Sequence, residues 1–192
     1  YSHCKAFLTH PFSVMRYFCG DITHVQAFLD RPGFRKSAGD PMLSINSVNC
    51  KFEKGGVGVL ISQRGDGRFG LGGWWSYEHV GTRGTFCIEN CVEQITYWPG
   101  HRKDENGKLY LPEKEVKNTG ITSFDATFPN RINAWLEDLT NKVHYEFIRS
   151  SGRDALATLE YIEAVIQSYE EGGALVRPHP LPPIHGTPEY IH

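Results

Sequence analysis

One stretch of the sequence has a pattern that could hold the phosphates of a dinucleotide. Gly65, Gly67 and Gly70 form a Gly-x-Gly-x-x-Gly pattern after a predicted strand. Such a pattern needs a helix directly after it, because the amide groups and dipole of the helix N-terminus bind the pyrophosphate. The residues that follow, 71–75, are Leu-Gly-Gly-Trp-Trp, which is not a helix start. We therefore interpret residues 65–70 as a loop between antiparallel strands and expect no cofactor-binding residue in this chain.

Aromatic residues follow this loop. Trp74, Trp75 and Tyr77 lie beside its glycines, where flat aromatic faces could close over a sugar ring or another apolar ligand face. The alternative is that the tryptophans pack into a sheet or a subunit interface. Trp74, Trp75 and Tyr77 are therefore candidate substrate-binding residues.

The cysteines favour reduced thiols. There are five, an odd number at irregular spacings, which is typical of a reducing compartment rather than a disulfide framework. Cys87 and Cys91 are close in sequence and have histidines nearby, but the further paired ligands of a structural zinc site are missing. The sequence therefore predicts no metal site.

Composition excludes several classes of partner. The chain has 192 residues and a net charge of -2, with Lys and Arg scattered, so nucleic acid is not expected. No apolar run approaches the roughly 20 residues that cross a bilayer, and residues 1–5 lack the plan of a signal peptide. We expect a cytoplasmic protein with no membrane partner.

The first half of the chain predicts a helix and several strands. Residues 10–20 predict an amphipathic helix that ends at a glycine, and residues 23–29 predict a strand. Runs 43–52 and 57–63 predict a hairpin, because the glycines in residues 53–56 suit its turn.

Short strands continue into the middle of the chain. They are predicted at residues 75–80, 84–89 and 92–98, which are rich in aromatic and β-branched residues. Residues 98–120 are then rich in charge, glycine and proline, which is typical of a surface insertion.

Two helices are predicted near the C-terminus. Apolar periodicity spans residues 132–139 and 156–169, and Asp154 is a plausible capping residue or first-turn acid of the second helix. A last short strand is predicted at residues 174–177, and a proline-rich extended tail at residues 178–192.

These elements predict one α+β domain over residues 1–177. Its mixed, mostly antiparallel open sheet has helices packed on one face, and no Rossmann domain is present. The other sheet face would be solvated or would meet a partner.

Several stretches together resemble one protein family. They are residues 10–21 with Val25-Gln-Ala, the hairpin residues 54–58, the strand-turn-strand at 77–86, and residues 152–172. Their order resembles the C-terminal domain of the Gfo/Idh/MocA (glucose-fructose oxidoreductase / inositol dehydrogenase / rhizopine catabolism) oxidoreductases. The resemblance implies a sheet that forms one wall of a sugar or polyol pocket and a homo-oligomer interface on the open face. It also implies a nucleotide-binding half for NAD(P), which is not in this sequence.

The resemblance implies one catalytic candidate, His10. Family members commonly have an Asp-x-x-x-His motif at the first helix of this domain, where the acid and the imidazole help to move the proton of a substrate hydroxyl. His10 occupies the histidine position, and an imidazole suits this work because its pKa lies near 7. Ala6 stands at the carboxylate position, and Ser13 stands where many relatives have another Asp. The chain by itself is therefore not expected to be a dehydrogenase.

Three functions follow from these observations. The first is the substrate-binding and oligomerisation half of an NAD(P)-dependent oxidoreductase acting on a sugar, polyol or related small molecule. The feature that favours this function is a chain that begins where the other domain should have just ended. The second is a stand-alone domain with cofactor-free acid-base chemistry, such as an isomerase, lyase or cyclase, which the loss of the acid at Ala6 favours. The third is a non-catalytic binding or oligomerisation module, which an exposed apolar patch on the open sheet face would indicate.

Overall fold

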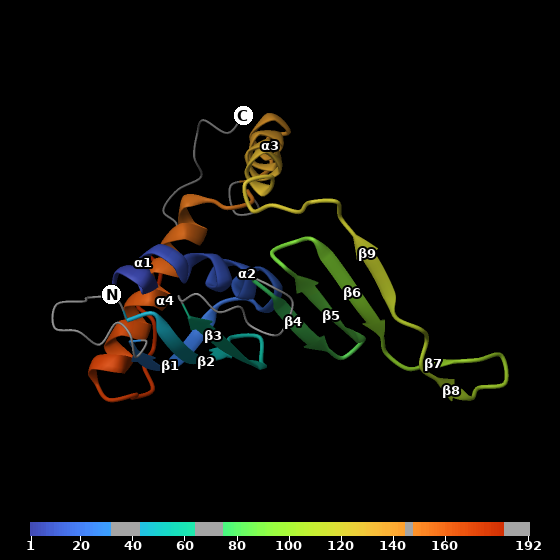
Figure 1. Ribbon diagram of the computed structural model, residues 1–192, viewed down its shortest axis with the longest axis horizontal. Coiled ribbons are helices and arrows are strands. Elements are labelled where there is room, and N and C mark those ends of the chain that lie inside the picture. The colour runs from blue at the N-terminus through green and yellow to red at the C-terminus, as the bar shows by residue number, and fades with distance from the viewer. Residues whose placement is uncertain (32–42, 64–74, 145–147, 183–192) are drawn as a thin grey trace. The chain divides into compact units, whose positions relative to one another are not determined.

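A computed structural model describes residues 1–31, 43–63, 75–144 and 148–182. The chain divides into two compact units, Tyr1–Gly65 with Asp138–His192, and Asp66–Glu137. Each unit contains its own antiparallel sheet (Figure 1). The glycine pattern at residues 65–70 and the candidate Trp74 lie outside the described residues.

The sheet of the first unit has three strands in the order β1-β2-β3. They are β1 (Ile22–Asp30), β2 (Ile45–Phe52) and β3 (Val57–Gln63), all antiparallel. The turn between β2 and β3 contains Gly55 and Gly56 at φ values of 91° and 94°. Both lie in the region that glycine favours, and the predicted hairpin is confirmed.

Three helices cover one face of this sheet. They are α1 (Ser2–Phe7), α2 (Thr9–Cys19) and α4 (Gly152–Glu170), which Figure 1 shows grouped beside β1 to β3. The α2 side chain Phe12 is fully buried and meets Tyr161 of α4 edge to face, with ring centroids 6.0 Å apart. A Cβ at Gly58 of β3 would lie 3.0 Å from Met15 Cε. Glycine at position 58 therefore lets α2 approach the sheet closely.

Local signals decide where α2 and α4 begin and end. Helix α2 ends at Gly20, which has a φ of 82°, as predicted. Helix α4 begins with a capping box: the Asp154 amide donates to Ser151 Oγ, and the Ser151 amide donates to the Asp154 carboxylate. Asp154 is thus the predicted first-turn acid. After α4, the strand predicted at residues 174–177 is reduced to an isolated bridge, in which Val176 pairs with Val25 at the edge of β1.

A polar network joins these elements at one end of the sheet. Arg16 of α2 pairs with Asp21 (Nε to Oδ1, 2.6 Å) and with Asp154 of α4. The Tyr161 hydroxyl donates to Asp21 Oδ1 at 2.9 Å and accepts from the amide of Ile22. Burial raises the pKa of Tyr161 to about 12, so its hydroxyl stays protonated and can donate to the carboxylate.

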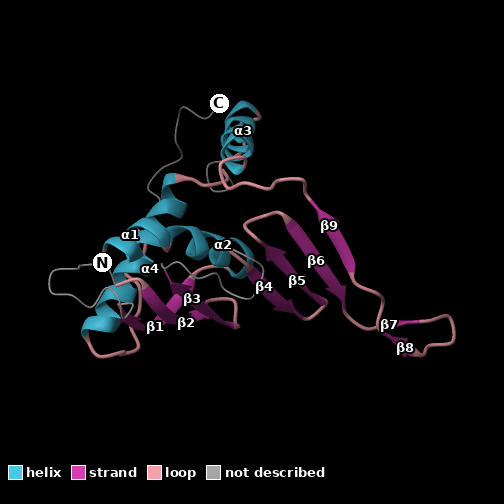
Figure 2. Ribbon diagram, in the orientation of Figure 1, coloured by secondary structure: helices cyan, strands magenta, loops and turns pink. Residues whose placement is uncertain are grey.

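The second unit holds a four-stranded antiparallel sheet and a small hairpin (Figure 2). The sheet order is β4 (Tyr77–Gly81), β5 (Gly84–Glu89), β6 (Gln94–Pro99) and β9 (Glu115–Asn118), and the hairpin consists of β7 (Arg102–Lys103) and β8 (Leu109–Tyr110). The three predicted strands of this region are confirmed. The segment assigned to a surface insertion also supplies β9, which pairs with β6.

Helix α3 (Thr127–Thr140) connects the two units along the chain. Its buried Asp138 is held by Arg149, whose NH2 group lies 2.7 Å from Asp138 Oδ1 and whose amide donates to Oδ2 at 2.8 Å. Within the described part of the chain, no helix is long and apolar enough to cross a membrane.

The architecture confirms the predicted fold class. The chain is α+β, the described sheets are antiparallel and open, and helices cover one face of the β1–β3 sheet. The opposite face of that sheet alternates polar side chains with exposed apolar ones.

Candidate functional site

The candidate His10 is the second residue of α2, in the first unit. Its side chain is exposed, and partial desolvation lowers its pKa below the ordinary histidine value. The imidazole is therefore neutral near pH 7 and can accept a proton. The preceding helix α1 presents an exposed Ala6, so the side chain four residues before His10 supplies no carboxylate.

The candidates Trp75 and Tyr77 lie at the start of the second sheet. Trp75 is half-buried, and its carbonyl accepts a hydrogen bond of 2.8 Å from the amide of Cys91 in the turn between β5 and β6. Tyr77 is the first residue of β4 and is also half-buried. The backbone of both residues therefore belongs to or contacts the second sheet.

A row of rings crosses this sheet at Tyr77. His79 stacks with Tyr77 (centroids 6.3 Å apart, planes at 23°) and with Phe86 of β5 (5.2 Å, 22°). The Tyr77 hydroxyl lies 3.2 Å from His79 Nδ1, within hydrogen-bond distance. Tyr97 of β6 stands opposite Phe86 in the register and so shares the same face. We call Tyr77, His79, Phe86 and Tyr97 the aromatic row.

The aromatic row combines flat apolar surface with polar edges. Its members are half-buried, so part of each ring is exposed to solvent. Such a surface suits the apolar face of a sugar, while the hydroxyls and the imidazole can bond to the sugar hydroxyl groups. Sequence reasoning missed His79 and Phe86. The spacing Tyr77-x-His79 indicates that these two residues share one face of a strand. The pairing of this strand with β5, which brings Phe86 beside them, could be seen only in the structure.

The sequence candidates fall into two groups. His10 belongs to the first unit, whereas Trp75, Tyr77 and the aromatic row belong to the second. The two groups differ in their chemistry. His10 can exchange a proton, and the aromatic row can bind a ring.

The cysteines are all free thiols. Burial raises the pKa of Cys50 to about 12, and it also raises the pKa values of Cys87 and Cys91. Among the residues that the structure describes, no group of three or more His, Cys, Asp and Glu side chains could hold a metal ion.

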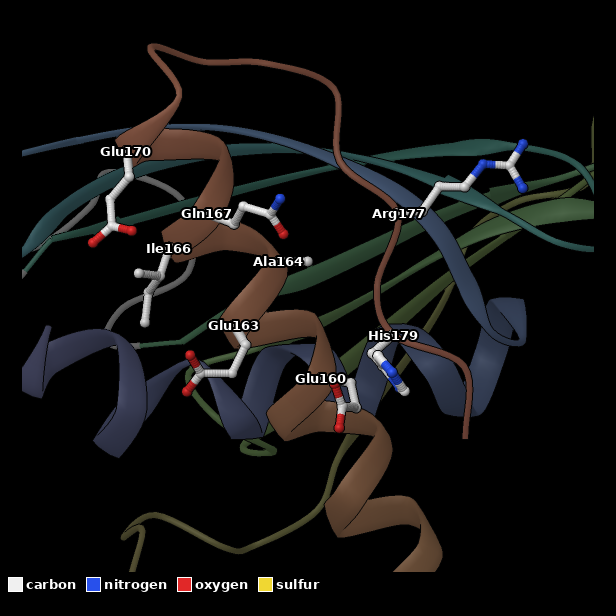
Figure 3. A pocket seen from close by; sticks show the side chains of 8 residues that line it. All are labelled: Glu160, Glu163, Ala164, Ile166, Gln167, Glu170, Arg177 and His179. Atoms are coloured by element: carbon white, nitrogen blue, oxygen red, sulfur yellow. The ribbon is translucent and has the colours of Figure 1, made fainter. Parts of the chain in front are cut away.

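A groove of about 230 Å³ lies along α4 (Figure 3). Two of the acids that line it have partners near the start of the chain: Glu163 pairs with Lys5 at 2.8 Å, and Glu170 accepts from the Tyr1 hydroxyl at 2.6 Å. Its volume falls below the roughly 300 Å³ at which small-molecule pockets begin. The groove lies between α4 and the segment that contains Arg177 and His179.

Comparison with known proteins identifies the class of fold. No protein-family model matches the sequence, and no curated protein matches it. Solved structures do match. Levoglucosan dehydrogenase in complex with NADH and L-sorbose is 15% identical with a TM-score of 0.70, over 95% of this chain and 50% of that chain. An NAD binding oxidoreductase from Klebsiella pneumoniae is 16% identical with a TM-score of 0.66, over 90% and 50%.

A third solved structure also matches this fold. A putative myo-inositol dehydrogenase from Sinorhizobium meliloti is 18% identical with a TM-score of 0.64, over 92% of this chain and 50% of that chain. The chain has the fold of the C-terminal domain of Gfo/Idh/MocA-type oxidoreductases, as the sequence motifs predicted. It spans about half the length of the structures that it matches.

Proposed function

We propose that this chain is the substrate-binding and oligomerisation half of an NAD(P)-dependent oxidoreductase that acts on a sugar, polyol or related small molecule. The observation that supports this most is the shared fold, because solved dehydrogenases match it over 90–95% of the chain. The five free thiols favour a reducing compartment, so we place the enzyme in the cytoplasm.

The one Gly-x-Gly-x-x-Gly pattern of the sequence, at residues 65–70, lies outside the described residues. The next described element along the chain is strand β4, instead of the helix whose N-terminus would bind the pyrophosphate. We therefore assign NAD(P) to protein outside this chain. His10 would exchange the proton of a substrate hydroxyl, and Trp74, Trp75 and Tyr77 would bind the substrate ring, with His79 and Phe86 completing the surface.

The test begins with the natural gene product. Its intact mass is measured, and this chain and the natural product are each titrated with NAD(H) and NADP(H) by tryptophan fluorescence. We expect a natural product much heavier than 21.7 kDa that binds a dinucleotide, and a chain that binds none by itself. A natural product of this size that binds no dinucleotide would contradict the proposal.

A second candidate function is that of a stand-alone domain with cofactor-free acid-base chemistry, carried by His10. The observation that favours it is Ala6, which stands where a carboxylate would assist His10. A general acid or base raises rates by about 10²- to 10⁴-fold. Interconversion of sugar isomers by the purified chain without any nicotinamide, abolished in His10→Gln, would favour this alternative over the dehydrogenase.

The open face of the β1–β3 sheet supports self-association. The register places Phe28, Val59 and Ile61 on the face opposite the helices, with exposed fractions of 58%, 59% and 67%. Ile45 and Val57 share this face, and Ser47, Asn49 and Lys51 separate the apolar side chains. We infer that this open face forms a homo-oligomer interface, and it would also serve a non-catalytic oligomerisation module.

A further inference from the structure

A second cleft lies at one end of the sheet of the second unit. It is lined by residues 81–85, residues 97–102 and Leu111, which belong to the β4–β5 turn, to β6 and to the segments around β7 and β8. Its volume is about 760 Å³. This lies within the range of roughly 300–1,000 Å³ that is typical of small-molecule sites.

The backbone holds the two sides of this cleft together. The Gly100 amide donates to the Arg83 carbonyl at 3.0 Å, and the Tyr97 hydroxyl donates to the same oxygen at 3.3 Å. Gly84 has a φ of 150°, and a Cβ there would lie 2.6 Å from the Trp98 carbonyl oxygen. Glycine at position 84 thus lets the β4–β5 turn approach the end of β6 closely. This approach keeps Arg83 near the segment that contains Arg102.

The charged side chains of the cleft are both positive. They are Arg83 and Arg102, and the lining contains no Asp or Glu. Across the described part of the chain, neither arginine forms an ion pair with a carboxylate. Guanidinium groups bind phosphate and carboxylate oxygens through paired hydrogen bonds, so an anion would satisfy donors that the protein leaves to solvent.

The cleft also offers an apolar surface beside this charge. Trp98 is 41% exposed and Leu111 is 63% exposed, and both line the cleft. The hydroxyls of Thr82 and Thr85 line it as well. An indole face, hydroxyl groups and unpaired guanidinium groups together match a ring that has hydroxyls and one anionic group.

We propose that this cleft binds an anionic sugar, with Arg83 and Arg102 on the oxygens of its phosphate or carboxylate group and Trp98 against its ring. The site lies wholly in the second unit and goes beyond the proposed oxidoreductase function. It needs neither NAD(P) nor His10, so binding measured without a nicotinamide tests it separately.

The test is calorimetric titration of the purified chain with glucose 6-phosphate, glucuronate, glucose and inorganic phosphate. We expect one or both anionic sugars to bind about tenfold or more tightly than glucose. Binding of glucose 6-phosphate alone identifies a phosphate site, and binding of glucuronate alone identifies a carboxylate site. Added salt should weaken the binding, because partly exposed charges are screened.

Variants locate the site. Arg83→Gln and Arg102→Gln should each weaken the binding of the anionic sugar about tenfold. Lys114→Gln removes one exposed positive charge of the same unit outside the cleft and should change nothing. Trp98→Leu should weaken the binding of the anionic sugar more than the binding of inorganic phosphate. Arg83→Lys keeps the charge without the paired donors and provides a second variant where Arg83→Gln does not fold.

Several results would overturn the proposal. One is equal binding of glucose and the anionic sugars, or no binding of any anion at millimolar concentration. Equal losses in Lys114→Gln and Arg83→Gln would show a diffuse charge effect instead of a site. Inorganic phosphate that binds as tightly as the anionic sugar would show an anion site without sugar recognition.

Discussion

His10 is exposed on the first turn of α2, yet its surroundings disfavour the charged imidazolium. A neutral imidazole near pH 7 is the form that takes a proton from a hydroxyl group. The absence of a carboxylate at Ala6 removes the partner that would raise the pKa of this imidazole. The lowered pKa itself comes from partial desolvation of the imidazole.

A pH titration tests His10. Because the folded pKa lies below the unfolded value of about 6.5, the unfolded chain binds the proton first as the pH falls. The contribution of His10 to the free energy of unfolding is therefore fully present above pH 6.5, and it is lost as the pH falls through the folded pKa. NMR of the imidazole should show a midpoint below 6.5. A midpoint at or above 6.5, checked against the signal lost in His10→Gln, would contradict the desolvation argument.

At the scale of elements, α4 connects most of the first unit. It packs on β1 and α2, and its first turn meets Arg16 through Asp154. Its capping box therefore does more than begin a helix, because Asp154 both caps α4 and pairs with α2.

Ser151→Ala should destabilise the first unit by about 0.5–2 kcal/mol, since the amide of Asp154 loses its hydrogen-bond acceptor. Urea denaturation followed by circular dichroism measures the free energy of unfolding. Ser151→Thr keeps a capping hydroxyl and serves as the control, with most of the stability retained. Equal losses in both variants would show that capping is not the cause.

Gly84→Ala should destabilise the second sheet by about 1–3 kcal/mol, because the backbone there has a φ of 150° and a Cβ would collide with the Trp98 carbonyl oxygen. Gly107→Ala is the matched control. Gly107 also has a positive φ, of 78°, but no atom lies within 4 Å of its Cβ position. Thermal unfolding should show the larger loss for Gly84→Ala. The reverse order would exclude the close approach as the source of the loss.

At the scale of the molecule, the β1–β3 sheet has helices on one face and exposed side chains on the other, which we infer to be the face for association. Exposed apolar side chains on its outer strands, such as Phe28 of β1 and Ile61 of β3, flank the polar Ser47 of β2. The inner faces of two sheets that pack together bury side chains of this kind.

Ile61→Glu should convert a homo-oligomer into a monomer, because each interface would then bury unpaired carboxylates. Sedimentation velocity of the natural product and of this chain measures the change in mass. Leu159→Glu places the same charge on an exposed residue of α4, away from the open face, and should leave the assembly intact. A wild-type monomer, or equal dissociation in both variants, would contradict the inferred interface.

Much of the fold was predictable because its signals are local. Gly20 ends α2, Gly55 and Gly56 form the hairpin turn, and the first-turn acid Asp154 marks the start of α4 within a few residues. The strand β9 was not predicted, since its composition is that of a surface loop and only pairing with β6 makes it a strand.

The sequence by itself determined the class of fold and the order of the main helices and strands, and it supplied the candidates His10, Trp74, Trp75 and Tyr77. Only the tertiary structure decided which side chains meet. Strand pairing sets those neighbours, and it brought His79 against Phe86 and placed Arg83 and Arg102 on one cleft. The physical reason is that spacing along a chain specifies a helix face or a strand face, whereas contacts between strands depend on register, and register depends on the packing of the whole sheet.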